Sequence, residues 1–433
     1  MRGPPGRQGA TDTHVAAVTL RIALGAALTA RVQHTPDHFV PRGEASTSGP
    51  HPTRIFGGIP GEPAEVRITH RGAHVDHAEW VSGASPDRVE PSCAHYRSCG
   101  GCPWMHLTPE AARRWRRQRV VDAFSAVGLT PDVEAVVPCP DGDRGYRHLV
   151  KLVPSPVRGG VRLGAYGRHS HDVVRVDGCG VAAAALRRWT GLVLPVPPDL
   201  LRHVVVRRSH ANGDVLATLV AWRDDPILGT LDLPAAGVAL HINDRPGDAI
   251  FGPGPTRRLR GAPYIEERVG GVRLRIGPTD FFQTNPSTAA RIWADLPRPE
   301  RLVDLYCGIG AVSLLVGGDT FGVEVSPAAV ARARENATLN RSAAEFVAGP
   351  VATTEVPERF VGATVVVNPP RAGLGAAVER VRALRPERLV YISCDPESLA
   401  RDLLALNMPI ERVTPYDMFP QTPHVETVVI ARW

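Results

Sequence analysis

The stretch LVDLYCGIGAVSLLV, residues 302–316, decides the predicted fold of the second half of the chain. An apolar run ends at Asp304, a turn with Gly308 and Gly310 follows, and a helical pattern begins directly after it. Glu324 stands at the end of the next apolar run, FGVE, 20 residues after Asp304. A strand, a glycine-containing turn and a helix in this order are typical of a parallel sheet with a ligand at its carboxyl edge.

The composition of the turn indicates which cofactor fits. An acid at the spacing of Glu324 can bind two ribose hydroxyls, and glycines let the backbone approach a ligand closely. The GxGxxG pattern of dinucleotide-binding proteins is missing, because the turn reads GIGAVS. We therefore predict an adenosine-containing cofactor and favour S-adenosylmethionine over a dinucleotide. A tight turn that binds nothing is the alternative.

The C-terminal region contains several short apolar runs with helical segments between them. They are RLVDLYCGIG, FGVEVS, TVVVNPP and RLVYISC. Strands that alternate with helices predict βαβ units and a parallel sheet. The fold class expected here is α/β, with a Rossmann-like domain at the C-terminus. Its chemistry should lie at the carboxyl ends of the strands.

Length and composition set the broad class. The chain has 433 residues, of which 43% are hydrophobic and 22% are charged, and it has no run of 18 apolar residues. Two or three folded domains, no membrane span and no signal peptide are expected, with a cytoplasmic location. The net charge is +6, and Lys151 is the single lysine. This balance fits a polyanionic partner without identifying one.

The first half of the chain has a different pattern. Short β-type segments such as EVRITH and HAEWVSG alternate with glycine, proline and serine turns between residues 13 and 90. They predict a small β-barrel or sheet. A helix is expected within residues 109–129. Its arginines form either a solvated face, which we favour, or a phosphate-binding one; they are Arg113, Arg114, Arg116, Arg117 and Arg119.

The stretch YISCDPESLARDL, residues 391–403, places Cys394 where the fifth apparent strand meets a helix. A buried packing thiol is the simple interpretation. However, Glu426 begins a later strand at the same predicted edge, beside a methyl donor. A thiolate that adds to C6 of uracil makes C5 nucleophilic, and a carboxylate can then remove the C5 proton. Because an unperturbed thiol has a pKa of about 8.5, we expect local activation of Cys394.

Five stretches together resemble a known family. They are DFFQTNPSTA, LVDLYCGIG, VVVNPPRAGLG, YISCDPESLARDL and DMFPQTPHVE, and they cover most of residues 279–430. In this order they resemble the RNA uracil-C5 methyltransferases, which make 5-methyluridine in tRNA and 23S rRNA. The resemblance implies that Cys394 is the nucleophile and Glu426 the general base.

The same resemblance implies the cofactor site. Gln283, Tyr306, Glu324 and Asn368 would contact S-adenosylmethionine. Most members of the family have an aspartate where this chain has Asn368. An asparagine keeps the hydrogen-bonding shape but loses the charge, and we interpret it as a subfamily trait.

Four of the seven cysteines are candidates for a metal centre: Cys93, Cys99, Cys102 and Cys179. An odd number of cysteines in a chain without a secretion signal argues against a disulfide framework. Four thiols suit either zinc or an iron–sulfur cluster, and their spacing does not choose between them. The resemblance to the 23S rRNA members implies a [4Fe-4S] cluster. Cys139 and Cys307 are expected to be packing residues.

The predicted organisation has three parts. Residues 61–91 resemble the end of a TRAM domain, so we expect a TRAM-like RNA-binding β-barrel over residues 13–90. A central mixed α+β domain with the cluster would span 91–270, and the methyltransferase domain 271–433. The predicted protein is a monomer that methylates uridine C5 in RNA, with 23S rRNA favoured. The alternatives are a tRNA uridine-C5 methyltransferase, a non-catalytic RNA-binding protein and a methyltransferase acting on small molecules or proteins.

Overall fold

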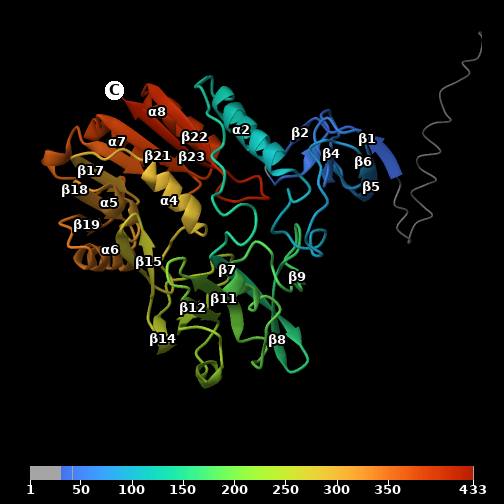
Figure 1. The fold of residues 1–433 in the computed structure, drawn as a ribbon, viewed down its shortest axis with the longest axis horizontal. Helices are drawn as coiled ribbons and strands as arrows, with labels where there is room; N and C mark the ends of the chain where they lie inside the picture. The colour runs from blue at the N-terminus through green and yellow to red at the C-terminus, as the bar shows by residue number, and fades with distance from the viewer. Residues whose placement is uncertain (1–30, 41, 433) are drawn as a thin grey trace, which may run out of the picture. The chain divides into compact units, whose positions relative to one another are not determined.

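The computed structural model describes residues 31–40 and 42–432, which form the coloured ribbon in Figure 1. The described residues divide into two compact units, with the boundary between Arg88 and Val89. The division into three parts at 90 and 270 stays a prediction, and residues 13–30 of the predicted barrel lie outside the described residues. Within the described ranges, no helix has both the length and the apolar character needed to cross a membrane.

The first unit contains a six-stranded sheet in the order β1-β5-β6-β4-β3-β2. Its strands are β1 (Arg31–His34), β2 (His38–Phe39), β3 (Ala45–Ser46), β4 (Thr53–Phe56), β5 (Ala64–Arg71) and β6 (Asp76–Gly83). The predicted segments EVRITH and HAEWVSG form β5 and β6. Ile55, Val66 and Ala78 are the centre of a small core. The TRAM-like character of this sheet stays a prediction.

The second unit begins with a central sheet in the order β10-β8-β7-β11-β12-β13-β14, with β9 beside β8. Its strands are β7 (Leu149–Val157), β8 (Gly160–Tyr166), β9 (Val173–Val174), β10 (Val193–Leu194), β11 (Leu201–Arg208), β12 (Val215–Ala221), β13 (Gly237–Ile242) and β14 (Thr256–Gly261). Val204 and Leu219 pack into one core cluster, whereas Val205 and Val220 pack into another. Alternate residues of β11 and β12 therefore serve opposite faces of the sheet.

A seven-stranded sheet follows, in the order β19-β18-β17-β20-β21-β23-β22. Its strands are β17 (Arg301–Leu305), β18 (Asp319–Glu324), β19 (Glu345–Ala348), β20 (Thr364–Val367), β21 (Arg388–Ser393), β22 (Ile410–Tyr416) and β23 (Glu426–Arg432). The first five strands are parallel, and β23 runs antiparallel to both β21 and β22. The predicted parallel sheet and the α/β fold class are confirmed.

Helices cover both faces of this sheet (Figure 1). They are α2 (Pro109–Ser125), α4 (Pro286–Ala294), α5 (Ala311–Val316), α6 (Pro327–Leu339), α7 (Ala377–Leu384) and α8 (Pro396–Leu406); shorter elements are α3 (Ala184–Arg187), η1 (Pro226–Thr230) and η2 (Glu358–Phe360). Val365 and Val367 of β20 face the cluster that contains α2, α7 and α8, whereas Val366 faces α4 and α5. The hairpin β15 (Ile265–Val269) and β16 (Val272–Ile276) packs on the α4 and α5 side.

Three helices near the edge of the sheet start in the same way. Asn285, Ser326 and Asp395 are the residues before α4, α6 and α8, and a proline follows each of them. Each side chain accepts a hydrogen bond from the backbone N–H three residues later, and proline loses nothing at the first helical position. Because Asp395 follows Cys394 directly, its cap fixes the point where β21 ends and α8 begins.

Candidate active site

The candidate site lies at the carboxyl edge of the seven-stranded sheet. The chain runs from β17 outward to β18 and β19, and later from β20 to β21 on the other side. The strand order therefore reverses between β17 and β20, which is the point where open α/β sheets bind their ligands. Tyr306, Glu324, Asn368 and Cys394 each lie at or directly after the end of a parallel strand.

The turn after β17 is tight and is held by Glu324. Tyr306, Gly308 and Gly310 have φ values of 67°, 53° and 81°. A Cβ on Gly310 would lie 3.0 Å from the ring of Phe346, so the turn needs glycine there. The Glu324 carboxylate accepts hydrogen bonds from the backbone N–H of Gly308 (3.2 Å) and Ser326 (2.9 Å). This acid stands at the edge where a ribose would bind.

Asp304 has a different role from Glu324. Its carboxylate is buried and accepts hydrogen bonds from the backbone N–H (3.1 Å) and hydroxyl (2.5 Å) of Ser313 in α5. Burial raises the pKa of Asp304 to about 7. The strand also extends one residue past Asp304, to Leu305. Asp304 thus fixes α5 against β17, and Glu324 is the acid closer to the ligand edge.

The other two predicted cofactor residues lie at different places. Asn368 follows β20, and its backbone N–H donates to Leu305 O at 3.4 Å, beside the turn. Gln283 lies in the segment before α4, where it lines a small pocket with His148, Arg207 and Phe282. The roles of Gln283, Tyr306, Glu324 and Asn368 in cofactor binding stay predictions.

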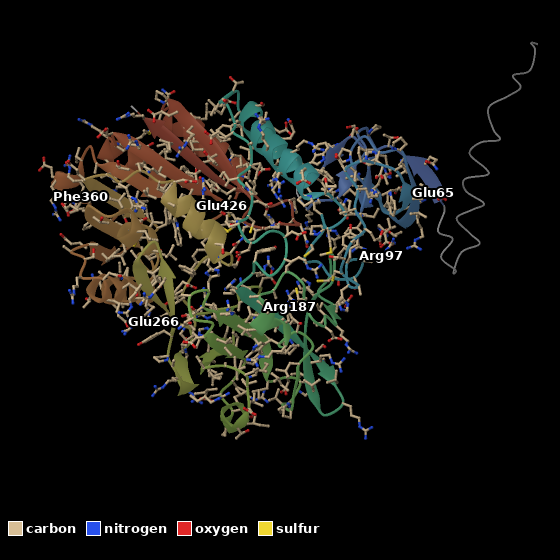
Figure 2. The ribbon with its side chains drawn as sticks, viewed as in Figure 1. Glu65, Arg97, Arg187, Glu266, Phe360 and Glu426 are labelled. Atoms are coloured by element: carbon tan, nitrogen blue, oxygen red, sulfur yellow. The ribbon has the colours of Figure 1, made fainter. Side chains whose placement is uncertain are left out.

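Strand register brings Cys394 and Glu426 together. Ser393, the last residue of β21, pairs with Thr427 of the antiparallel β23. The next position in this register places Cys394 beside Glu426, the first residue of β23. Figure 2 labels Glu426 at this end of the strand. A thiol and a carboxylate that are 32 positions apart in the sequence therefore share one edge.

The electrostatics of this pair fit a base better than an activated thiol. Glu426 is only 3% exposed, and burial raises its pKa to about 7, opposed by the positive charge of Arg371. Burial and then the charge of Glu426 raise the pKa of Cys394, while Arg371 lowers it through its charge and a hydrogen bond. The expected activation of Cys394 is therefore not found in the free protein. Arg371 is the group beside Cys394 that favours the thiolate.

The segment that leads into Glu426 is held by helix α2. Arg116 is fully buried, forms an ion pair with Asp417 at 3.2 Å, and donates to Thr422 O at 3.0 Å. Arg119 donates to Pro423 O at 3.2 Å and pairs with Glu397 of α8 at 3.0 Å. For these two arginines, neither the solvated-face interpretation nor the phosphate-binding one is right. They fix the position of residues 417–425 instead.

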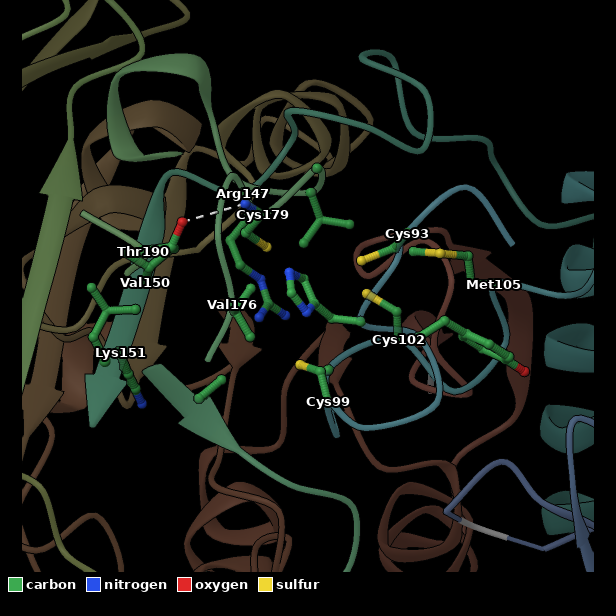
Figure 3. Close-up of a pocket in the computed structure, with 17 residues that line it drawn as sticks. Cys93, Cys99, Cys102, Met105, Arg147, Val150, Lys151, Val176, Cys179 and Thr190 are labelled. Carbon is green, nitrogen blue, oxygen red and sulfur yellow. Dashed lines mark hydrogen bonds between the residues drawn. The ribbon is translucent and has the colours of Figure 1, made fainter. Parts of the chain in front are cut away.

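The four predicted metal-ligand cysteines line one pocket, shown in Figure 3. Cys93, Cys99 and Cys102 come from the loop before α2, and Cys179 comes from the segment between β9 and α3. The backbone N–H of Cys179 donates to the hydroxyl of Thr190 at 3.4 Å. Arg147 lines the same pocket. Cys102 and Cys179, 77 positions apart in the sequence, thus line the same cavity, and the metal-binding role of the four cysteines stays a prediction.

Burial shapes the chemistry of these thiols. It raises the pKa of Cys102 to about 12 and also raises the pKa of Cys99, while the positive charge of Arg147 lowers both. Thiols of this kind stay protonated at neutral pH unless a metal replaces the proton.

The cysteine loop also contacts the segment before Glu426. The backbone N–H of Trp104 donates to Gln421 O at 2.9 Å, and the hydroxyl of Tyr146 donates to Pro420 O at 3.0 Å. Gln421 itself has a left-handed backbone with φ of 65°. Two hydrogen bonds thus connect Trp104 of the cysteine loop and Tyr146 to the segment that leads into Glu426.

Cys139 and Cys307 are buried, as predicted for packing residues. Cys139 packs with Tyr146 and Val181, and Cys307 packs with Phe346. Sequence reasoning missed Arg371 and Arg116. The spacing of Arg116, Val120 and Phe124, four residues apart on one helical face, was the available signal for the burial of Arg116.

Comparisons with known proteins agree with this geometry. The family model described as tRNA (Uracil-5-)-methyltransferase matches residues 355–432. An uncharacterized RNA methyltransferase of Geobacter sulfurreducens is 34% identical over 422 residues, with 87% of this chain and 84% of the relative covered. One from Parasynechococcus marenigrum is 33% identical, with 87% and 90% covered.

A solved structure extends the likeness to the whole fold. The tRNA (uracil-54, C5)-methyltransferase of Pyrococcus abyssi, solved in complex with S-adenosyl-L-homocysteine, has a TM-score of 0.73 and 25% sequence identity. The match covers 92% of this chain and 100% of that one. With its sheet order, its Cys394–Glu426 edge and these relatives, the chain belongs to the RNA uracil-5-methyltransferase family.

Proposed function

We propose that this protein transfers a methyl group from S-adenosylmethionine to C5 of a uridine in RNA, and that the RNA is 23S rRNA. The observation that carries the proposal is the meeting of Cys394 and Glu426 at the edge where Glu324 holds the glycine turn. The complex of the Pyrococcus abyssi relative with S-adenosyl-L-homocysteine supports the choice of methyl donor.

Each residue of the edge has one task in this reaction. The thiolate of Cys394 forms a bond to C6 of uracil, and the electron pair of the C5–C6 double bond moves toward C5 and O4. When bound, S-adenosylmethionine would supply the methyl group: C5 would form a bond to the methyl carbon as the bond of that carbon to the sulfonium sulfur breaks, which leaves S-adenosylhomocysteine. Glu426 then accepts the C5 proton, the C5–C6 double bond forms again, and the C6–S bond breaks to release Cys394.

The pKa of Glu426 suits this task. A general base works best when its pKa lies near the working pH, and burial raises that of Glu426 to about 7. Arg371 is placed to stabilise the Cys394 thiolate, both as the leaving group and before the attack. A protonated Glu426 removes a neighbouring negative charge, so the two groups titrate as a pair.

The substrate must leave its base stack before C5 can be reached. Phe281 is 70% exposed and lies two residues before Gln283. An exposed aromatic ring at this position can stack on an unpaired base. RNA is therefore a better substrate class for this edge than a small molecule.

We also infer that Cys93, Cys99, Cys102 and Cys179 hold a [4Fe-4S] cluster. All four cysteines line one pocket, and their resemblance to the cysteine set of the 23S rRNA members favours the cluster over zinc. When bound, the cluster would supply a structural crosslink and not a methyl-transfer step.

The choice of 23S rRNA over tRNA rests on this cysteine set, which resembles that of the 23S rRNA members. The test is methyl transfer from labelled S-adenosylmethionine to unmodified 23S rRNA and to tRNA, followed by nucleoside analysis. We expect 5-methyluridine in rRNA alone. Label in tRNA would support the proposed reaction but contradict the proposal that the substrate is 23S rRNA alone. No 5-methyluridine in either RNA, from cluster-loaded protein, would overturn the reaction and favour an RNA-binding protein in which Asn368 marks lost activity.

A further inference from the structure

A third group of ligand-bearing side chains lies outside both the catalytic edge and the cysteine pocket. Asp141 lies in the loop before β7, His148 directly precedes β7, and His210 lies in the turn between β11 and β12. One potential ligand atom of each lies within 4.8 Å of the others. Nothing in the proposed methyl transfer uses these side chains.

Hydrogen bonds of the backbone N–H groups fix the backbone at the two histidines. The N–H of His148 donates to Thr284 O at 2.7 Å. The N–H of His210 donates to the buried carboxylate of Glu267, also at 2.7 Å. The two rings are 5.0 Å apart between centroids and inclined by 55°. These hydrogen bonds fix the backbone at both histidines, as a preorganised site requires.

The nitrogen atoms of His148 differ in their surroundings. His148 is 5% exposed, and Nη1 of Arg208 lies 3.4 Å from its Nδ1. Nε2 is thus the nitrogen that remains for a ligand. Imidazole nitrogens are common ligands of transition-metal ions.

A fourth donor atom is already present. The hydroxyl of Ser287 in α4 forms a hydrogen bond with the Asp141 carboxylate at 2.5 Å and lies 3.4 Å from Nε2 of His210. Asp141 and His210 are exposed, so an ion can enter from solvent. The donor set is two imidazole nitrogens, one carboxylate and a hydroxyl or a water molecule.

We propose that Asp141, His148 and His210 bind a divalent transition-metal ion of the Zn²⁺ class, with Ser287 or water as the fourth ligand. Two imidazoles and one carboxylate are a ligand set that zinc takes in a four-coordinate site. The ion connects the start of β7 and the β11–β12 turn to the start of α4. Gln283 and Thr284 lie directly before α4 and contact this region, so the ion fixes the segment that carries Gln283.

The test uses the full chain with its cysteine pocket loaded, and Co²⁺ as the probe. Cobalt bound by nitrogen and oxygen ligands gives visible d–d bands without the intense near-ultraviolet charge-transfer band of cobalt thiolates, so the two pockets are distinguished. We expect one equivalent of nitrogen- and oxygen-ligated Co²⁺ per chain, displaced by Zn²⁺.

The variants His210→Ala and Asp141→Asn remove exposed ligands, and His74→Ala, an exposed histidine of the first unit, is the matched control. Loss of a ligand should weaken Co²⁺ binding at least about a hundredfold, since loss of an outer partner alone costs about 10–100-fold. The control should bind like the wild type. Equal binding in all three variants, or a thiolate spectrum alone, would overturn the site. Circular dichroism confirms that each variant is folded.

Discussion

The catalytic edge and the cysteine pocket both place half-buried thiols beside an arginine, yet their chemistry differs. Burial raises the pKa of Cys394 in one and of Cys99 and Cys102 in the other. The difference lies in the neighbours, because Cys394 has the carboxylate of Glu426 beside it, whereas the pocket thiols have one another. A thiol next to a base suits covalent catalysis, and several thiols around one cavity suit a metal centre.

The largest expected effect is on methyl transfer, and it should leave the cysteine pocket unchanged. Cys394→Ala removes the group that makes C5 of uracil nucleophilic, so methyl transfer should fall by about 10⁴-fold or more. Iron content and melting temperature should stay those of the wild type. Cys139→Ala, which changes a buried thiol that packs with Tyr146 and Val181, is the control and should keep its activity. Retained methylation in Cys394→Ala would remove the thiol from the mechanism.

Replacement of the carboxylate should stop the reaction at a later step. Glu426→Gln keeps the shape of the side chain but cannot accept the C5 proton, so turnover should fall by about 10³-fold. Because the C6–S bond breaks only after that proton leaves, a protein–RNA adduct that carries the new methyl group should accumulate. Denaturing electrophoresis with labelled S-adenosylmethionine detects it. The double variant with Cys394→Ala should show no adduct.

The pocket responds to a different change. Cys102→Ser should lose iron and lower the free energy of unfolding by on the order of 4 kcal/mol, as expected for loss of a structural metal. Because Trp104 of the same loop donates to Gln421 O, the segment before Glu426 should loosen as well. Iron analysis, thermal unfolding and limited proteolysis measure these effects. Full iron content in Cys102→Ser would exclude Cys102 as a ligand.

The contact between α2 and residues 417–425 can be tested by itself. Arg116→Met leaves Asp417 buried without its partner, so the free energy of unfolding should fall by about 3–5 kcal/mol. Gln118→Met, at an exposed position on the same helix, should change it by less than about 0.5 kcal/mol. Urea denaturation compares the two variants. Equal midpoints would mean that the ion pair does not hold this segment.

The smallest expected effect is the change of the methylation rate with pH as Glu426 ionises. With the pKa of Glu426 raised to about 7, its ionisation alone should raise the methylation rate about tenfold between pH 6 and pH 8, and ionisation of Cys394, whose pKa is also raised, adds to this rise. The sign for stability is opposite, because the folded protein binds the Glu426 proton more tightly than the unfolded chain. The stabilising contribution is full below pH 4.5 and is lost as the pH rises through about 7. Glu426→Gln should remove this part of the pH dependence of unfolding.

Much of the site could be predicted because sheet geometry follows from local pattern. The runs that end at Glu324, before Asn368 and before Cys394 are strands of one parallel sheet, so their ends meet at one edge. The antiparallel β23 places the start of its strand at that same edge, which brings Glu426 to Cys394. The alternation of strands and helices along the chain indicates which strands are parallel, so the positions of these residues at one edge could be predicted from the sequence.

The remaining features depend on contacts between distant segments. The hydrogen bond of Arg371 to Cys394 crosses from the loop after β20 to the end of β21, and no local pattern encodes it. Arg116 pairs with Asp417, 301 positions away, so a helix face that reads as solvated is buried. The burial that raises the pKa of Cys394 also comes from tertiary packing, and the expectation of an activated thiol failed for that reason.

The most direct test of the central claim follows the C5 hydrogen. RNA with tritium at C5 of uridine should release one tritium to water for each methyl group transferred, because Glu426 removes that proton in every turnover. Cys394→Ala should release none, and Glu426→Gln should incorporate methyl groups without matching release. Methyl transfer by the wild-type protein with tritium retained at C5 would contradict the account, since the methyl group would then lie on another atom.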